Sequence, residues 1–202
     1  MGLTSFDERA KDWDADPAKV ERAQVVAQAI RAALPPQPGK SALEVGCGTG
    51  LLSFFLQKDF AHITLADSSE GMLEVLRAKI AAARAKNLTA LRLDLSADPL
   101  PEARFDVIYS LMVLHHLPDT AKSLSQFHAL LNPGGWLVIC DLDAEDGSFH
   151  PAGTSGIHFG FTRPALQKQV ESAAFNTIKF STPYVLQKAG KSYPLFLLTA
   201  QK

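Results

Sequence analysis

The chain has 202 residues, of which 47% are hydrophobic and 20% are charged, and its formal net charge is −1. This length and composition suit one ordinary domain with a substantial core and leave little room for a second full domain. A nearly neutral chain has no general field that attracts polyanions, so tight, sequence-independent binding of DNA or RNA is not expected.

The beginning of the chain is polar and lacks the apolar core of a signal peptide. No stretch combines the length and the unbroken apolarity that a membrane span needs. The two cysteines, Cys47 and Cys140, do not make a disulfide framework. We therefore expect a reducing, cytoplasmic compartment.

The first predicted element is a helix that follows a charged segment at 4–16. Apolar residues recur at three- and four-residue steps over 20–34, which indicates one buried stripe. Asp16 suits the N-cap and Pro17 the first helical position. The proline-rich run 35–39 ends the helix and is interpreted as a short connector.

The central feature of the sequence is a strand-type run at 42–45 that ends in a glycine loop. The three glycines stand at alternate positions, Gly46, Gly48 and Gly50. A helical stretch at 51–56 follows at once. Glycines let the backbone turn tightly and approach a ligand closely, and a helix N-terminus adds free N–H groups. The alternative is a tight strand-to-helix turn without a ligand.

The spacing of these glycines disfavours a nicotinamide dinucleotide. The dinucleotide fingerprint has glycines at its first, third and sixth places, and the sixth place here is Leu51. A nicotinamide-dependent dehydrogenase is therefore an improbable alternative.

A second apolar run, at 63–66, ends in Asp67, about twenty residues after the loop. A carboxylate at the end of a second strand can accept two hydrogen bonds from ribose hydroxyls. The next helix begins after Ser68 or Ser69, either of which can be its N-cap. Its basic residues fit a solvated face better than a nucleic-acid patch.

Three further strands are predicted along the chain, and each leads into polar residues. They cover 88–93, 105–110 and 136–140, with a helix capped by Asp119 and a turn at 132–135 before the last of them. Alternation of five strands with helices indicates an α/β, doubly wound parallel sheet that is covered on both faces. Ligands in such sheets bind at the carboxyl ends of the strands, where Asp67, Asp94 and Asp141 stand.

The last part of the chain contains a segment without periodicity, 144–161, which holds His150 and His158. A helix is predicted from Thr162 onward, with Leu166, Val170, Ala173 and Ala174 facing inward. Two runs, 175–182 and 192–200, then predict a closing pair of strands.

Several of these strings together resemble the class I S-adenosylmethionine-dependent methyltransferases, in particular the small-domain group of ubiquinone and menaquinone biosynthesis. They are Glu-Val-Gly-Cys-Gly-Thr-Gly at 44–50, Asp-Ser-Ser-Glu-Gly-Met at 67–72, Asp-Leu at 94–95 and Leu-Asn-Pro-Gly-Gly at 131–135. The resemblance covers about 41–143. It implies a three-layer Rossmann-like fold with seven strands, mostly parallel, and a reversed C-terminal hairpin strand.

The resemblance also implies one methyltransferase domain over 1–202. Its parts would be an N-terminal cover segment and helix (1–38), a cofactor-binding core (39–143), a variable acceptor-side segment (144–161), and a C-terminal helix and strand hairpin (162–202).

By the same resemblance the cofactor is S-adenosylmethionine and the product S-adenosylhomocysteine. The glycine loop would hold the methionine part, Asp67 the ribose, and Asp94 with Leu95 the adenine, next to Met72. Ser110 would border the methyl group, and Phe6 and Trp13 would cover the cofactor. The expected cofactor-binding residues are Glu44, Gly46, Cys47, Gly48, Gly50, Asp67, Ser68, Met72, Asp94, Leu95, Ser110 and Trp13.

His115 is the candidate general base, because it follows the fourth strand and imidazole exchanges protons near neutrality. The alternative is that His115 or His116 only borders the site or bonds a backbone group. No metal is expected, since the histidines show no ligand spacing.

A small-molecule methyl acceptor is favoured. Methyltransferases of nucleic-acid and protein nitrogens often carry Asn/Asp-Pro-Pro-aromatic after the fourth strand, and this chain has Ser-Leu-Met-Val at 110–113. A protein or RNA methyltransferase and a cofactor-binding module without turnover remain alternatives. The sequence leaves the oligomeric state open.

Overall fold

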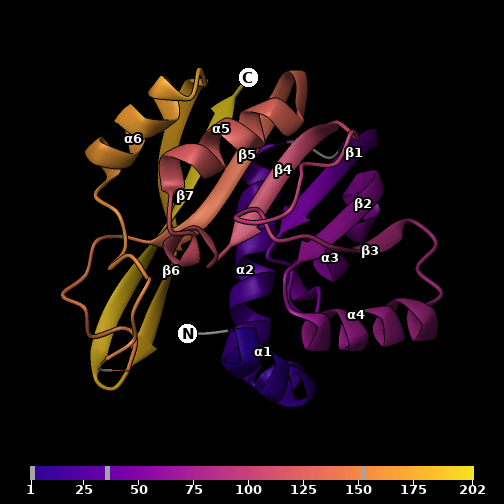
Figure 1. The fold of residues 1–202 in the computed structure, drawn as a ribbon, viewed down its shortest axis with the longest axis horizontal. Helices are drawn as coiled ribbons and strands as arrows, with labels where there is room; N and C mark the ends of the chain where they lie inside the picture. Colours follow the sequence, from indigo (N-terminus) through magenta and orange to yellow (C-terminus); the bar gives the residue numbers. More distant parts are fainter. Residues whose placement is uncertain (1–2, 35–36, 152) are drawn as a thin grey trace. The chain divides into compact units, whose positions relative to one another are not determined.

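The protein was analysed as a computed structural model, which describes residues 3–34, 37–151 and 153–202. Within these residues seven strands form one sheet in the order β3-β2-β1-β4-β5-β7-β6 (Figure 1). The chain divides into two compact units, Met1–Asp94 and Leu95–Lys202, which are taken in turn.

The first unit carries three strands and the N-terminal helices. In chain order its elements are α1 (Leu3–Arg9), η1 (Ala10–Ala15), α2 (Pro17–Ala33), β1 (Gln37–Val45), α3 (Leu51–Leu56), η2 (Gln57–Asp59), β2 (Phe60–Asp67), α4 (Glu70–Ala83) and β3 (Leu88–Arg92).

Local capping signals start its two longer helices, as the sequence predicts. The Asp16 carboxylate accepts a hydrogen bond from the N–H of Ala18 with Pro17 at the first position of α2, and Ser69 caps α4 through the N–H of Met72. The helix α2 ends at Ala33. The Pro35–Pro36 part of the predicted break lies outside the described residues, and β1 already begins at Gln37.

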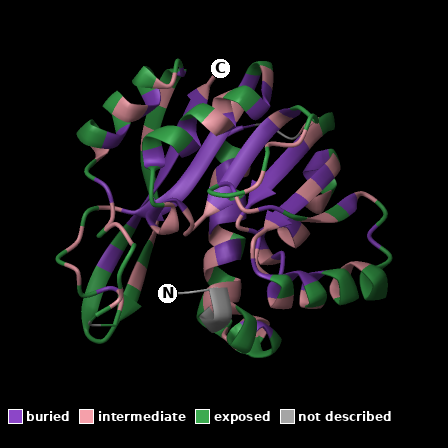
Figure 2. Cartoon of the chain, in the orientation of Figure 1, coloured by how far each residue is buried: buried purple, intermediate pink, exposed green. Residues whose placement is uncertain are grey.

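The parallel strands β1, β2 and β3 bring three strand ends to one edge of the sheet. Val45 is in register with Ala66, and Asp67 with Arg92. Apolar side chains such as Leu43 form the core beneath this edge, and Figure 2 shows the burial concentrated along the strands. The glycine loop after β1 and the carboxylate after β2 are therefore neighbours.

The second unit contains the remaining four strands. Its elements are β4 (Phe105–Leu111), η3 (Leu114–His116), α5 (Thr120–Leu130), β5 (Leu131–Leu142), α6 (Arg163–Ser172), β6 (Asn176–Lys188) and β7 (Lys191–Gln201). Strand β4 is parallel to β5, whereas β7 is antiparallel to both β5 and β6. The predicted α/β fold with a mostly parallel sheet and a reversed C-terminal hairpin is thus confirmed.

Two local details differ from the sequence prediction. The predicted turn at 132–135 lies inside β5, where the pairing with β4 shifts register after Leu131 and Gly134 takes a φ of 74°. A glycine-containing irregularity of this kind keeps the strand paired while bending it. Of the inward positions predicted for α6, Leu166 and Val170 are buried, but Ala174 is exposed because the helix has already ended.

None of the helices in the described residues has the length and apolarity that crossing a membrane requires.

Substitution of Gly50 tests the packing of the glycine loop. A Cβ on Gly50 would lie 2.6 Å from Cδ1 of Leu76 at a φ of 80°, whereas a Cβ on Gly39 would meet nothing within 4 Å. Because overpacking and a left-handed backbone both cost energy, Gly50→Ala is expected to lower the free energy of unfolding by about 2–4 kcal/mol. Urea denaturation measures this change, with Gly39→Ala as the control, and equal stability of the two variants would contradict it.

Candidate functional site

The glycine loop makes a tight turn between β1 and α3. Gly46, Gly48 and Gly50 have φ values of 65°, 53° and 80°, a region that side-chain-bearing residues rarely adopt. The N–H of Gly50 donates to the carbonyl of Cys47 at 2.8 Å and closes the turn. The Cys47 side chain is buried, and this burial raises the pKa of its thiol well above the ordinary value. Cys47 is therefore an unreactive wall of the loop.

Asp67 ties this loop to the start of α4. Its Oδ2 accepts the N–H of Gly48 at 2.7 Å, and its Oδ1 accepts the N–H of Ser69 at 2.9 Å. The backbone of Ser68 also hydrogen-bonds to this carboxylate. Burial raises the pKa of Asp67, and these backbone hydrogen bonds offset part of the increase. A carboxylate has about four acceptor sites, so capacity remains for a ribose hydroxyl.

Met72 and Trp13 face the middle of the loop. A Cβ on Gly48 would lie 3.8 Å from Sδ of Met72 and 4.0 Å from Nε1 of Trp13. The Trp13 ring also packs at 6.1 Å from Phe6 and lies under the Lys19 ammonium, which is 4.0 Å from its centroid. The predicted N-terminal cover therefore lies against the glycine loop.

Carboxylates of the N-terminal segment anchor it there. Asp7 accepts hydrogen bonds from the Ser69 hydroxyl and the Gly71 N–H, which lower its pKa. Asp14 accepts from the Thr49 hydroxyl and pairs with Lys79 at 2.5 Å. The segment is thus held both to the loop and to α4.

Glu44 is buried inside β1 and accepts a hydrogen bond from the Ser53 hydroxyl of α3. Burial raises its pKa to about 8 from the ordinary 4.5, despite the hydrogen bond from Ser53, which lowers it. The side chain is therefore mostly protonated at pH 7 and holds loop and helix together as a neutral acid.

The remaining predicted cofactor residues divide between the units. Asp94 follows β3, next to Leu93, whose N–H donates to the Asp67 carbonyl at 3.0 Å. Leu95 and Ser110 belong to the second unit. Both are buried, and the carbonyl of Leu95 accepts a hydrogen bond from the side chain of Gln126. The structure therefore gathers the glycine loop, Asp67, Ser68, Met72, Asp94 and Trp13 within the first unit.

His115 of the second unit is buried and paired with Asp141. Its ring Nδ1 lies 2.6 Å from Oδ1 of Asp141, and its backbone N–H donates to Oδ2 of the same carboxylate at 3.2 Å. The Nε2 atom is buried without a hydrogen-bond partner among the described residues. Burial opposes the charge of Asp141, but the neighbouring His115 and its hydrogen bonds keep the carboxyl pKa below its ordinary value.

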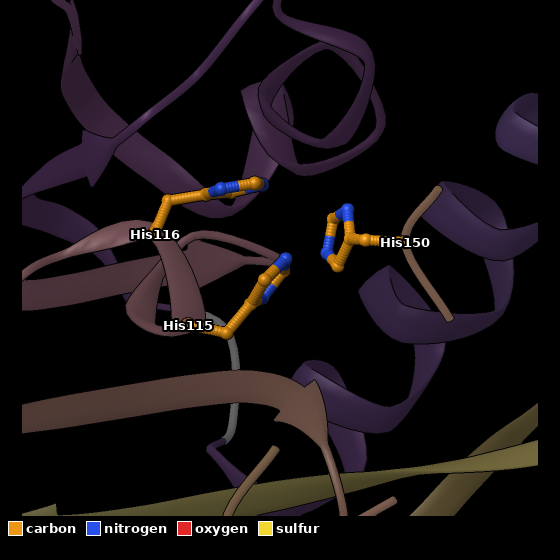
Figure 3. Close-up of side chains that lie close together, drawn as sticks. All are labelled: His115, His116 and His150. Carbon is orange, nitrogen blue, oxygen red and sulfur yellow. The ribbon is translucent and has the colours of Figure 1, made fainter. Parts of the chain in front are cut away.

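Two further histidines surround this side chain. The ring centroids of His116 and His150 lie 4.1 Å and 5.2 Å from that of His115. Figure 3 shows the three imidazole rings converging, two from η3 and one from the segment after β5. Burial, together with neighbouring His115, lowers the pKa of His116 to about 3 and that of His150 to about 4, so both are neutral at pH 7.

Sequence reasoning missed the partners in both units. The anchoring carboxylates Asp7 and Asp14 showed no pattern beyond a charged segment. His150 stands 35 positions after His115 in a segment without periodicity. The one available signal was Asp141 at a strand end, which pointed to the correct edge of the sheet but not to its histidine partner.

A mostly parallel seven-stranded sheet with a reversed hairpin, a glycine loop after β1 and a carboxylate after β2 defines a Rossmann-like methyltransferase fold. Residues 43–137 match the family model described as a methyltransferase domain.

Curated relatives agree with this class. An uncharacterized methyltransferase of Mycobacterium tuberculosis is 34% identical over 111 residues, which cover 55% of each chain. A ubiquinone biosynthesis O-methyltransferase of Coxiella burnetii is 31% identical over 144 residues, covering 70% of this chain and 61% of the relative. The chain thus matches little more than half the length of these relatives.

Solved structures show the same fold at low identity. A chain of the complex between the Haloferax volcanii Trm112 methyltransferase activator and a methyltransferase aligns with a TM-score of 0.81 and 16% identity, over 97% of this chain and 96% of that one. Phosphoethanolamine N-methyltransferase 2 of Haemonchus contortus in complex with S-adenosylmethionine has a TM-score of 0.72 and 16% identity, over 87% and 52%. The [4+2]-cyclase SpnF has a TM-score of 0.73 and 16% identity, over 89% and 80%.

Together these findings support a class I S-adenosylmethionine-dependent methyltransferase, a class whose cofactor is S-adenosylmethionine.

The raised pKa of Glu44 predicts a pH-dependent stability. Between about pH 4.5 and 8 the folded chain keeps a proton that the unfolded chain releases, so the free energy of unfolding falls as pH rises through this range. We expect Glu44→Gln to remove this decline. Near pH 8 its free energy of unfolding should exceed that of wild type by on the order of 4 kcal/mol.

Urea denaturation across this pH range measures the effect of Glu44→Gln. Glu74→Gln, on the exposed face of α4, is the matched control and should follow the wild-type curve. Parallel curves for Glu44→Gln and wild type would show that Glu44 is ionised in the folded chain.

Proposed function

We propose that the protein transfers a methyl group from S-adenosylmethionine to a small-molecule acceptor. The observation that carries this proposal is Asp67, which is fixed by Gly48 and Ser69 with acceptor capacity left for a ribose hydroxyl. We assign the space beside Gly48, which Met72 and Trp13 flank, to the methionine part of the cofactor. These residues are assigned to the cofactor on this basis, with Glu44 supporting the loop from beneath.

The reaction needs little covalent chemistry from the protein. The acceptor's lone pair attacks the methyl carbon in line, the sulfur–carbon bond breaks, and its electron pair stays on sulfur to give S-adenosylhomocysteine. Alignment of the two reactants can supply about 7–11 kcal/mol of the barrier reduction. Aromatic side chains of the N-terminal cover, Phe6 and Trp13, would exclude water from the cofactor.

An acceptor hydroxyl must also lose its proton, and we assign this role to His115. Its Nε2 is buried and unpartnered among the described residues, so it can accept a proton, while Asp141 holds Nδ1 and stabilises the resulting imidazolium. The ubiquinone O-methyltransferase among the relatives supports an oxygen acceptor on a small molecule.

Two other functions compete with this proposal. The first is methylation of a protein or RNA; the neighbour from the Trm112 activator complex shows that this fold also occurs in a complex with an activator protein. The second is another reaction altogether, since the fold also occurs in the [4+2]-cyclase SpnF. Formation of S-adenosylhomocysteine with small hydroxylated or phenolic acceptors distinguishes methyl transfer from both alternatives.

The cofactor assignment is tested by Asp67→Asn. Loss of the charged acceptor for the ribose hydroxyls is expected to weaken binding of S-adenosylhomocysteine by about 10- to 100-fold. Isothermal titration calorimetry measures this, with Asp98→Asn as a control outside the loop and thermal melting as a check of folding. Unchanged affinity in Asp67→Asn would contradict the ribose assignment, and no binding to wild type would overturn the proposed function.

The role of His115 is tested by His115→Ala with a small hydroxylated or phenolic acceptor that the wild type methylates. Without the base, kcat is expected to fall by about 10²- to 10⁴-fold while cofactor affinity is retained. Added imidazole should restore part of the rate in His115→Ala and not in the control His128→Ala. An unchanged kcat would show that the acceptor reacts without this base.

A further inference from the structure

Three histidines of the second unit bring their ring nitrogens into one small volume. One nitrogen from each of His115, His116 and His150 lies within 4.8 Å of the other two (Figure 3). His115 is only 1% exposed, and the other two are half-buried. We propose that this cluster, named here the histidine triad, binds one divalent transition-metal ion of the zinc class.

The orientation of His115 favours this use. Metal-binding histidines usually donate their second ring N–H to a carboxylate or carbonyl, which fixes the tautomer and directs the other nitrogen at the ion. Asp141 provides that contact, at 2.6 Å from Nδ1, and its Oδ1 also accepts the N–H of Leu142. The carboxylate is thus fixed in place, and Nε2 of His115 is left as the ligand atom.

Unsatisfied nitrogens supply an independent observation. Nε2 of His115 and Nε2 of His150 are both buried without a hydrogen-bond partner among the described residues. A buried polar atom without a partner costs free energy, so such atoms are uncommon in folded proteins. An ion bound between the rings would satisfy both nitrogens at once.

The spacing of the triad suits an ion after a small adjustment. Zinc–nitrogen bonds of about 2.0–2.1 Å place tetrahedral ligand nitrogens about 3.4 Å apart. His115 and His116 lie in η3, whereas His150 lies in the long connection between β5 and α6. Because none of the three histidines lies in a strand, closure of the three rings around an ion would bring the set to bonding distance without moving a strand.

Three neutral nitrogen ligands select among metals. Imidazole suits zinc, copper, nickel and cobalt, while magnesium and calcium require oxygen ligands. Three protein ligands also leave a fourth position for water or an oxygen of a small molecule. A bound ion would occupy Nε2 of His115, so the metal-loaded protein could not use that nitrogen as the base proposed above.

Direct metal binding tests the triad without cofactor or acceptor, so its outcome is separate from the test of the proposed function. Tag-free protein is stripped with a chelator and titrated with Zn²⁺ by calorimetry and with Co²⁺ by visible absorption. We expect one ion per chain, cobalt bands typical of nitrogen ligands, and a melting temperature that rises with Zn²⁺ concentration.

The variants locate the ion. His150→Ala and His116→Ala should each weaken Zn²⁺ binding by at least about 100-fold, and Asp141→Asn by about 10- to 100-fold through the orientation of His115. His62→Ala, a half-buried histidine of β2, is the matched control and should bind as wild type does. Asp141 is wholly buried, so folding of Asp141→Asn is checked first. Where that variant does not fold, His150→Gln takes its place in the test.

Two results would overturn the proposal. The first is the absence of stoichiometric Zn²⁺ or Co²⁺ binding by wild type. The second is unchanged affinity in both His150→Ala and His116→Ala, which would place the ion elsewhere on the chain.

Discussion

The first unit depends on one carboxylate that accepts two backbone hydrogen bonds. Asp67 takes the N–H of Gly48 from the glycine loop and the N–H of Ser69 from the start of α4, at 2.7 and 2.9 Å. Since β1 and β2 are parallel and in register, their ends already lie side by side, and Asp67 converts this proximity into a defined loop conformation. Hydrogen bonds to an ionised acceptor are among the stronger ones, so the loop is held in place before any ligand arrives.

The sequence predicts most of this unit because its determinants are local. Asp16 and Ser69 each cap the helix that follows them, as Asp119 does in the second unit, and a cap is recognisable within a few residues of sequence. The glycine loop is likewise set by neighbouring residues, and the parallel sheet explains why Asp67 reaches it from about twenty residues away. Local patterns fail where pairing between strands decides the secondary structure. The glycines at 132–135 suggest a turn, but these residues lie within strand β5.

The histidine triad could not be predicted, since it depends on contacts between distant segments. His116 follows His115 directly, which gives no helical or strand period, and His150 lies in a connection without regular structure. Only the folded chain shows that Asp141 orients His115 and that His150 reaches the same volume. Backbone strain is a further sign of a functional region here, because Met112 adopts a φ of 59° just before η3.

Asp141, a wholly buried carboxylate near the end of β5, would serve both functions proposed for His115. As the partner of a base it stabilises a positive imidazolium, and as the partner of a ligand it fixes a neutral imidazole toward an ion. Both uses require Nδ1 to carry a proton and Nε2 to be open, which is the arrangement that the 2.6 Å contact favours. A proton and a metal ion therefore compete for the same nitrogen, so the identity of the occupant decides which chemistry the second unit can contribute.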